Sequence, residues 1–489
     1  MDLTKLTLLQ AKKGLENKEF SSLELTEACI KNAEKNKRLN AFITETFDYA
    51  RDRAKLSDKK IAENKNVGKL EGIPLAIKDL FCTNGIRTTA GSRMLENFVP
   101  PYESTVTKKL LDEGYVLIGK TNMAEFAADA TNKTSYFGPC INTYKMNNGD
   151  DRDLIPGGSS GGSAVAVAGD MCFGATGSDT GGSIRQPASL CGLVGLKTTY
   201  GRISRYGMVA YASSLDQAGF LTKDVRDCAY LTHIVCGKDD KDSTTIEHDL
   251  PDFLANLNPN IKGKKVGVVK EFETFLDKID PDVRDKYLQA IELLKANGAE
   301  IVKISIPTIT ASSLLYIVLS YTELASNLSR YTGVRYGRQT EEKVSSYEEL
   351  FTKSRSEGFG ENIKKRVLLG YHLSTSENYE KYFIKSQKIR RKIANEFDEA
   401  LKLVDVILTP TDSGTAFPIN PTEEEQKIIT ERGIINDYFI NAVNMAGLPG
   451  ISVPFDFSKL GLPIGMQFIG RLFDEQSVLN FALFIEENK

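Results

Sequence analysis

Two short segments rich in glycine and serine are the parts of this sequence best suited to chemistry. The first covers residues 156–163 and the second covers residues 177–185. Glycine lets consecutive backbone amides point at one place, and a helix that starts beside them adds positive potential there. The first segment runs into an apolar Ala/Val-rich stretch, so we expect it to be packed rather than a flexible linker. No Lys-Ser/Thr pair closes it, which argues against a nucleotide-binding P-loop.

The second segment has the composition of an oxyanion hole. Its candidate donors are the backbone amides of the three residues before Ser183, namely Thr180, Gly181 and Gly182. Such a row of amides can hold the negative oxygen that develops when a hydroxyl attacks a carbonyl group. The alternative is a glycine-rich turn held by a buried Asp179–Arg185 ion pair, and the motif alone leaves both interpretations open.

Lys78 is a candidate general base. It ends the apolar run of residues 73–77, and Phe81 follows closely. If Lys78 is buried, desolvation lowers its pKa, and a neutral lysine can accept a proton. The alternation of side chains along a strand could instead turn it toward solvent.

Histidine is scarce in this chain, which restricts the possible mechanisms. The only three histidines are His233, His248 and His372, and none lies in either glycine/serine segment. A Ser-His-Asp hydrolase needs a histidine, and no GxSxG motif surrounds a serine near them. A lysine base acting on a serine nucleophile accounts for the motifs without histidine.

Composition places the chain among globular proteins. It has 489 residues, 41% hydrophobic and 26% charged, with a formal net charge of -3. The small net charge argues against bulk electrostatic binding to nucleic acid. Seven cysteines without a CxxC pair predict a reduced, intracellular protein with no disulfide framework and no structural zinc. With no signal peptide or membrane span in the pattern, we expect a cytoplasmic protein.

Strands and helices are expected to alternate along the chain, which predicts an α/β fold. Residues 1–65 have helical spacing of apolar residues and are expected to form an N-terminal helical segment. Helices are also expected at residues 161–168, 282–296 and 475–487. The expected strands cover residues 73–78, 115–119, 172–178, 265–269, 301–306, 404–408, 451–454 and 464–469. No repeat or linker divides the chain, so we expect a single domain over residues 1–489.

Taken together, the two segments and the lysine resemble the amidase signature family. The resemblance covers almost the whole chain, with residues 157–163, 177–187 and 72–79 as its most specific motifs. Further matching motifs lie at residues 191–197, 213–217, 446–451 and 462–467. The resemblance implies a large mixed β-sheet core covered by helices on both faces. After Glu125-Phe126-Ala127 the family has Met-Gly and two small hydroxyl residues, whereas this chain has Ala-Asp-Ala-Thr at residues 128–131.

The resemblance also implies the roles of individual residues. It makes Ser183 the nucleophile and Lys78 the general base, with Ser159, after a cis peptide bond, relaying the proton between them. It places Ser160, Asp179 and Arg185 around these residues as the groups that hold the loop. The implied reaction is attack on a carboxamide, giving an acyl-enzyme and ammonia, followed by hydrolysis.

Within the family, the chain is similar to the branch whose members hydrolyse glutamine. That similarity implies that Arg366 binds the α-carboxylate, that Asp437 binds the α-amino group and that Tyr316 lines the pocket. In this branch the ammonia passes to a partner, the B subunit, which uses ATP and Mg²⁺ to convert Glu-tRNA(Gln) to Gln-tRNA(Gln), and Asp-tRNA(Asn) is a second possible substrate. A small C subunit stabilises the complex, and the glutaminase subunit itself needs no metal or organic cofactor.

Two other interpretations compete with a glutaminase subunit. A stand-alone amidase acting on small carboxamides would need neither a partner nor Arg366 and Asp437. A non-catalytic scaffold that kept the fold would tolerate the loss of Ser183.

Overall fold

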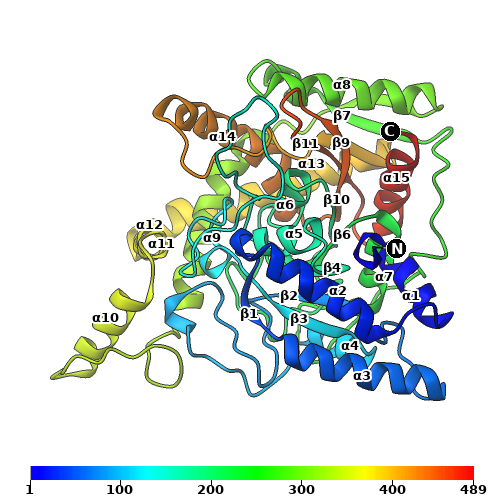
Figure 1. Ribbon diagram of the computed structural model, residues 1–489. Helices are drawn as coiled ribbons and strands as arrows, with labels where there is room; N and C mark the ends of the chain where they lie inside the picture. Colours follow the sequence, from blue (N-terminus) through cyan, green and yellow to red (C-terminus); the bar gives the residue numbers. More distant parts are fainter. Residues whose placement is uncertain (1) are drawn as a thin grey trace.

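The computed structural model describes residues 2–489, and one mixed β-sheet of eleven strands runs through it (Figure 1). The strand order is β1-β3-β2-β4-β6-β5-β10-β11-β9-β7-β8. The strands are β1 (Phe42–Glu45), β2 (Pro74–Lys78), β3 (Val116–Thr121), β4 (Gly174–Asp179), β5 (Val194–Lys197), β6 (Gln217–Thr222), β7 (Lys265–Val269), β8 (Glu300–Ile304), β9 (Val406–Pro410), β10 (Gly450–Phe457) and β11 (Pro463–Ile469).

The sheet is parallel in two regions and antiparallel between them. β2 pairs in parallel with β3 and β4, and β7 pairs in parallel with β8 and β9. The connecting strands β6, β5, β10 and β11 pair antiparallel. Every residue of β2, β3 and β4 is buried, which explains why these strands appear in the sequence as continuous runs rather than alternating patterns.

Helices cover both faces of the sheet, as predicted. Side chains alternate between the two faces along a strand, so Gly174 and Gly177 of β4, three positions apart, face opposite sides of the sheet. A Cβ on Gly174 would lie 2.8 Å from Leu231 of α7 (Val225–Val235). A Cβ on Gly177 would lie 2.7 Å from Ile184, the residue before α6 (Arg185–Leu190). The α/β prediction with a large mixed sheet is therefore confirmed.

The remaining helices frame this sheet. They are α1 (Leu8–Glu16), α2 (Ser22–Lys35), α3 (Phe47–Glu63), α4 (Thr105–Asp112), α5 (Gly161–Ala168), α8 (Pro281–Ala296), α9 (Ser312–Leu328), α10 (Tyr347–Gly358), α11 (Glu361–Leu373), α12 (Ser376–Asn378), α13 (Lys385–Leu403), α14 (Glu423–Ala446) and α15 (Glu475–Asn488). Figure 1 shows α10 extending from the body of the molecule, with α11 and α12 between it and the sheet. None of the helices in residues 2–489 has the length and apolar character needed to cross a lipid bilayer.

The N-terminal segment is not entirely helical, which corrects the prediction for residues 1–65. Asn40 adopts a left-handed conformation after the first helices, and β1 then pairs antiparallel with β3 and forms one edge of the sheet. β1 has only four residues, too few to produce a periodic pattern in the sequence. The prediction also omits β5 and β6, which are short strands containing glycine.

Candidate active site

Lys78 lies at the carboxyl end of β2 and is fully buried. Its Nζ is 2.7 Å from the Oγ of Ser159 and 2.8 Å from the Oγ atoms of Ser160 and Ser178. The outward-facing alternative for Lys78 is therefore wrong, because the strand is covered on both faces. Three serine hydroxyls surround the amine, and no carboxylate lies within salt-bridge distance of it among residues 2–489.

The surroundings of Lys78 favour its neutral form. Burial lowers the pKa of Lys78 well below its ordinary value, and the nearby carboxylates of Asp179 and Asp216 oppose that shift only in part. A neutral amine has a lone pair, so Lys78 can accept a proton from an adjacent hydroxyl. This is the electrostatic property that a lysine base requires.

The first glycine/serine segment is packed, as expected. Ser159 and Ser160 are fully buried, and the peptide bond between Gly158 and Ser159 is cis. The carbonyl oxygen of Ser159 accepts a hydrogen bond from the amide of Ala124 at 3.2 Å. Ser160 precedes α5, and its Oγ donates to the carbonyl oxygen of Ser178 at 3.3 Å. The linker interpretation of this segment is therefore excluded.

Ser183 lies in the turn between β4 and α6, with 8% of its surface exposed. Its Oγ makes no hydrogen bond with another side chain or with the backbone in residues 2–489, and so none with Ser159. The hydroxyl is thus unpaired and accessible at the edge of the serine–lysine group. A nucleophile needs to be accessible to the substrate, and in the active arrangement Ser183 Oγ must also come within hydrogen-bonding distance of the relay hydroxyl.

The three candidate oxyanion donors are not equivalent. The amide of Gly182 donates to Asp179 Oδ1 at 2.7 Å and is therefore already paired. The amides of Thr180 and Gly181 have no acceptor in the described part of the chain. Thr180 is anchored by its side chain, whose Oγ1 donates to Asp216 Oδ1 at 2.6 Å. The geometry leaves the Thr180 and Gly181 amides available for a ligand.

Asp179 and Arg185 form a fully buried bidentate ion pair. Arg185 Nη2 lies 2.9 Å from Asp179 Oδ1, and Arg185 Nε lies 3.0 Å from Oδ2. Arg185 also donates to Asn444 Oδ1 and Gln467 Oε1, both at 2.6 Å. Burial raises the pKa of Asp179, but Arg185 outweighs that effect and lowers it overall. The ion pair ties the Ser183 turn to α14 and β11.

Replacing Arg185 with methionine should lower the free energy of unfolding by about 3–5 kcal/mol, because it leaves the Asp179 carboxylate buried without a partner. Urea denaturation measures the difference. The matched control is Arg284→Met, which removes partly exposed pairs with Asp277 and Asp285 and should cost at most about 1 kcal/mol. Equal losses in the two variants would contradict the structural role of the buried pair.

Arg366 is on α11 and has no acidic partner. Its Nη1 donates to the Tyr211 hydroxyl at 2.9 Å, its Nε donates to Asn362 Oδ1 at 3.2 Å, and its guanidinium lies 4.7 Å from the centre of the Tyr321 ring. No Asp or Glu oxygen lies within 4.0 Å of it in residues 2–489. A solvated helix face is therefore not its environment, and its charge is available for an anion.

Asp437 is on α14 and accepts a hydrogen bond from Ser313 Oγ at 2.6 Å. Burial raises the pKa of Asp437 to about 6, although Ser313 and Asn441 lower it in part. Tyr316, on α9, lies against the Ser183 turn. A Cβ on Gly181 would lie 2.7 Å from the Tyr316 ring and 2.6 Å from Asn441 Oδ1. Only glycine fits at residue 181 between these two helices.

These contacts bring the predicted site residues into one region. Arg366 is bonded to Tyr211, whose ring lies 6.5 Å from that of Tyr316, and Tyr316 packs on Gly181. Asp437 is one helical turn before Asn441, which also packs on Gly181. The helices α9, α11 and α14 therefore carry charged groups of both signs to the turn that holds Ser183.

Four residues at this site have no role in the sequence prediction. Ser178 is the third hydroxyl beside Lys78, and Asp216 anchors both Thr180 and the backbone amide of Tyr211. Asn441 and Tyr211 connect the substrate helices to the Ser183 turn. Ser178 and Asp216 do lie within the recognised motifs, so position in a motif was the available signal. No local signal marks Tyr211 or Asn441.

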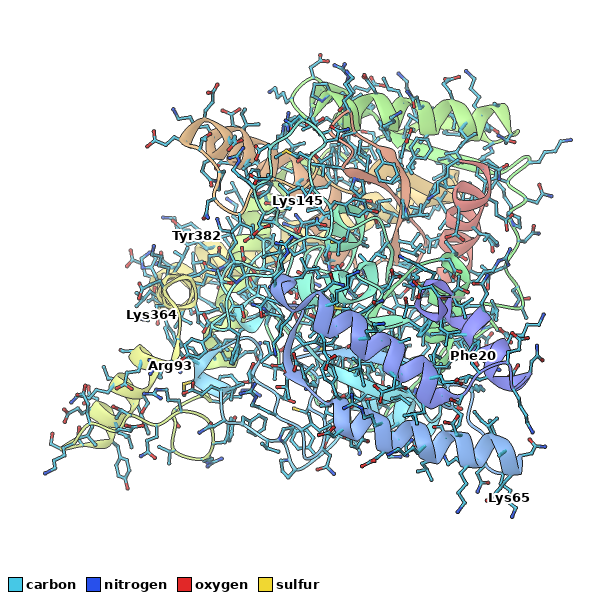
Figure 2. The ribbon with its side chains drawn as sticks, in the orientation of Figure 1. Phe20, Lys65, Arg93, Lys145, Lys364 and Tyr382 are labelled. Atoms are coloured by element: carbon cyan, nitrogen blue, oxygen red, sulfur yellow. The ribbon has the colours of Figure 1, made fainter. Side chains whose placement is uncertain are left out.

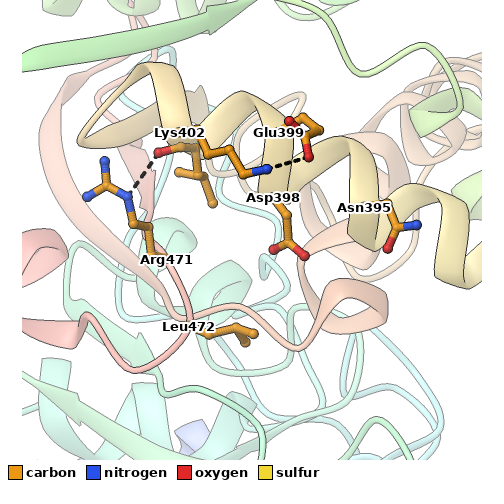
Figure 3. A pocket seen from close by; sticks show the side chains of 7 residues that line it. Asn395, Asp398, Glu399, Lys402, Arg471 and Leu472 are labelled. Atoms are coloured by element: carbon orange, nitrogen blue, oxygen red, sulfur yellow. Dashed lines mark hydrogen bonds and ion pairs between the residues drawn. The ribbon is translucent and has the colours of Figure 1, made fainter.

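A cavity of about 390 Å³ opens beside Asp437. Gln186, Asp412 and Asn436 contribute to its lining, together with Ala130 and Thr131 from the segment that departs from the family pattern. The pocket in Figure 3 lies elsewhere, between the end of α13 and Arg471, and contains the Lys402–Glu399 ion pair. It includes none of the site residues. No group of three or more His, Cys, Asp or Glu side chains in residues 2–489 is arranged to hold a metal ion.

None of the three histidines is hydrogen-bonded to Lys78, Ser159 or Ser183. The Nδ1 atoms of His233 and His248 are within hydrogen-bonding distance of backbone oxygens, and His372 Nε2 is 3.3 Å from Asn378 Nδ2. All seven cysteines are free and buried.

The fold and the site agree with the comparisons to known proteins. The amidase family model matches residues 24–479, so the chain belongs to the amidase family. The A subunit of glutamyl-tRNA(Gln) amidotransferase from Wolbachia pipientis is 46% identical over 488 residues, covering 100% of this chain and 98% of the relative. The corresponding protein of Rickettsia bellii is 47% identical, with 99% and 97% covered. The predicted resemblance is confirmed.

Solved structures support the same placement. The crystal structure of the A subunit of glutamyl-tRNA(Gln) amidotransferase from Thermotoga maritima superposes with a TM-score of 0.80 at 38% identity, covering 100% of this chain and 96% of that one. Native peptide amidase from Stenotrophomonas maltophilia has a TM-score of 0.79 at 27% identity, with 99% and 96% covered.

Proposed function

We propose that this chain is the glutaminase subunit of a tRNA-dependent amidotransferase. It hydrolyses glutamine and supplies the ammonia that converts Glu-tRNA(Gln) to Gln-tRNA(Gln). The observation that carries the proposal is the convergence of Arg366 and Asp437, on two different helices, at the turn that holds Ser183. Full-length similarity to the A subunits of glutamyl-tRNA(Gln) amidotransferases supports it.

In the proposed mechanism, the proton moves from the nucleophile to the lysine through a serine. Ser183 Oγ attacks the side-chain carbonyl carbon of glutamine as its proton passes to Ser159, and Ser159 passes its own proton to neutral Lys78. The amides of Thr180 and Gly181 hold the negative oxygen that forms. The proton returns through Ser159 to the departing nitrogen, which leaves as ammonia. Water then attacks the acyl-enzyme by the same route and releases glutamate.

Substrate selection rests on the two charged groups at the α-carbon of glutamine. Arg366 offers a planar guanidinium suited to two parallel hydrogen bonds with the α-carboxylate. Asp437 offers an anion for the α-ammonium group, and Tyr316 closes the wall beside Gly181. Ser160, Asp179 and Arg185 hold the surrounding loops through the contacts described above.

The proposed role of Asp437 predicts a pH dependence. Its pKa of about 6 means that it becomes protonated, and loses its charge, as the pH falls through that value. We expect kcat/KM for glutamine to fall as the pH drops through about 6 and Asp437 becomes protonated, and to be constant at higher pH. The ionisation of the free enzyme is the relevant one, because kcat/KM reports on the free enzyme. Initial rates of glutamate release between about pH 5 and 8 measure this.

The control separates Asp437 from Lys78, which also titrates. Glutaramate, the monoamide of glutaric acid, lacks the α-amino group, so its pH profile should not contain the Asp437 step. In the Asp437→Asn variant, the pH profiles of kcat/KM for glutamine and glutaramate should have the same shape. The same step in the glutaramate profile would assign it to another group.

We also propose the partners of this chain. The B subunit would bind ATP and Mg²⁺, activate the glutamyl group and hold most of the tRNA, and the C subunit would stabilise the complex in the cytoplasm. Asp-tRNA(Asn) is included as a second acceptor. The single domain over residues 1–489 stays a prediction alongside these partners.

Co-purification followed by a glutaminase assay tests the proposal. The expected result is glutamate release that increases when the partner proteins and Glu-tRNA are present. If no partner binds and simple carboxamides react faster than glutamine, the chain is a stand-alone amidase and the proposal is wrong.

A further inference from the structure

A short segment, residues 124–128, joins the two halves of the proposed site. At one end, the amide of Ala124 donates to the carbonyl oxygen of Ser159 at 3.2 Å. In the middle, Phe126 and Ala127 have φ angles of 47° and 60°, so two consecutive non-glycine residues adopt the left-handed conformation. Such residues cost on the order of 1–3 kcal/mol each and persist only where surrounding contacts hold them.

Glu125 connects this segment to the start of α11. It is 2% exposed, and both of its carboxylate oxygens lie 3.1 Å from the amide of Gly360. Gly360 is the residue before α11 and has no side chain to cap the helix, so the Glu125 carboxyl group accepts the hydrogen bond of the Gly360 amide. Burial raises the pKa of Glu125 to about 7, and the hydrogen bonds from Ser92 and Gly360 oppose that shift only in part. Ser92 Oγ donates to the same carboxylate at 2.6 Å and fixes its orientation. A Cβ on Gly360 would lie only 2.5 Å from Glu125 Oε2.

A second bond joins the other end of the segment to the same helix. Asn362 Nδ2 donates to the carbonyl oxygen of Ala128 at 3.0 Å. The Oδ1 of Asn362 accepts from Arg366 Nε at 3.2 Å, one turn further along α11. This hydrogen bond uses the backbone carbonyl of Ala128 and not its side chain. It therefore does not depend on the side chain at residue 128, where the sequence departs from the family pattern. Asn362 therefore contacts both the segment and the guanidinium group.

Aromatic contacts also join the segment to the start of α11. The Phe126 ring lies 5.7 Å from that of Phe359, which precedes α11, and 5.2 Å from that of Tyr331. The segment thus holds the first turn of α11 by a carboxylate, a backbone carbonyl and an aromatic ring. Because Arg366 lies on α11 one turn after Asn362, contacts that hold the first turn of the helix also help to hold Arg366 relative to Ser159.

We infer that Glu125 and Asn362 are positioning residues for Arg366, and that they set how well the site recognises the α-carboxylate of its substrate. This inference rests on the proposed function, because it needs Arg366 to bind that carboxylate. Neither Glu125 nor Asn362 touches the reacting atoms in the proposed mechanism. Their removal should therefore weaken binding of substrates that carry the carboxylate and leave the chemical step intact.

The test compares two amides in the full chain purified with its co-expressed partner proteins. Glutamine has the α-carboxylate, and the amide of γ-aminobutyric acid has the same amino and carboxamide groups without it. We expect Glu125→Ala and Asn362→Ala each to raise KM for glutamine about tenfold, with kcat changed less than about twofold. KM for the amide of γ-aminobutyric acid should stay the same. Glu125→Gln keeps an acceptor for the Gly360 amide and should restore most of the affinity.

Glu361→Ala is the matched control. Glu361 is the first residue of α11 and pairs with Lys364, which is labelled in Figure 2, and it makes no hydrogen bond or ion pair with residues 124–128. It should leave both KM values unchanged. Adding Glu125→Ala to Arg366→Ala should give no further loss, because the effect passes through Arg366.

Several results would overturn the inference. A loss of kcat, an equal loss with both amides, or full additivity in the double variant would each mean that Glu125 acts otherwise. If Glu125→Ala does not fold, Asn362→Ala carries the test with the same expected result. If Arg366→Ala leaves KM for glutamine unchanged, the proposed role of Arg366 fails. If Arg366→Ala raises KM for glutamine but Glu125→Ala and Asn362→Ala do not, the proposed function stands and only the positioning role of Glu125 and Asn362 is wrong.

Discussion

Replacing Ser183 with alanine should lower kcat for glutamine hydrolysis by about 10⁴- to 10⁶-fold, because the hydroxyl that forms the acyl-enzyme is lost. Ser183 is the accessible serine of the site, and its Oγ has no hydrogen-bond partner to remove, so the fold should be unaffected. Release of glutamate from glutamine measures the loss, and the melting temperature checks the fold.

The complex provides an internal control for this variant. Supplying ammonium directly bypasses glutamine hydrolysis, so the Ser183→Ala complex should still convert Glu-tRNA(Gln) when ammonium is present. Ser189→Ala alters another serine of the same region, whose Oγ accepts from the Gly465 amide, and should retain glutaminase activity. Full activity of Ser183→Ala with glutamine would leave a non-catalytic scaffold as the remaining interpretation.

Replacing Lys78 with alanine should lower kcat by about 10²- to 10⁴-fold, the range expected when a general base is removed. Lys78 is the basic group that contacts the serine hydroxyls, and burial keeps its pKa well below the ordinary value. Because the neutral amine is the active form, the rate should rise as the pH rises through this lowered pKa and then level off. Combining Lys78→Ala with Ser183→Ala should add little, since the two residues act as a unit.

The histidines provide the contrast. A variant in which His233, His248 and His372 are all replaced should keep most of its glutaminase activity, since none is bonded to Lys78, Ser159 or Ser183. A large loss from any one histidine would rule out the lysine as the base. The comparison also detects indirect damage, because the triple variant carries more substitutions than the lysine variant.

The architecture of the sheet could be predicted largely from local pattern. Residues 73–78 and 464–469 are apolar runs of the length of a strand, and β2 and β11 lie there. β1 could not be predicted, because its four residues are held by pairing with β3, more than one helix away in the sequence. β5 is equally short, and its pairing with β10 joins residues far apart in the chain.

The residue types of the site could also be recognised from the sequence. The two glycine/serine segments and a lysine at the end of an apolar run indicated serine chemistry without histidine, and motif resemblance indicated the residues around them. Pattern alone could not decide whether Lys78 is buried, because a strand offers both faces to its side chains. Only the packing of helices on both faces of β2 decided that.

Tertiary structure decided which groups are free to react. The Gly182 amide is paired with Asp179, which distinguishes it from its neighbours Thr180 and Gly181, yet nothing in the sequence separates the three. Arg366 stands beside two lysines in the sequence and resembles a solvated helix face, but Tyr211, 155 positions away, places it inside the site.

The sequence by itself determined the chemical groups, the class of fold and the absence of a histidine-dependent motif, because these depend on residue type and on short-range spacing. The tertiary structure decided the pKa of Lys78, the pairing of each amide and the position of Arg366. Each of these depends on desolvation or on a hydrogen bond between residues far apart in the chain. Such contacts arise only when the helices and strands pack together, as Lys78 and Ser178 do across 100 positions.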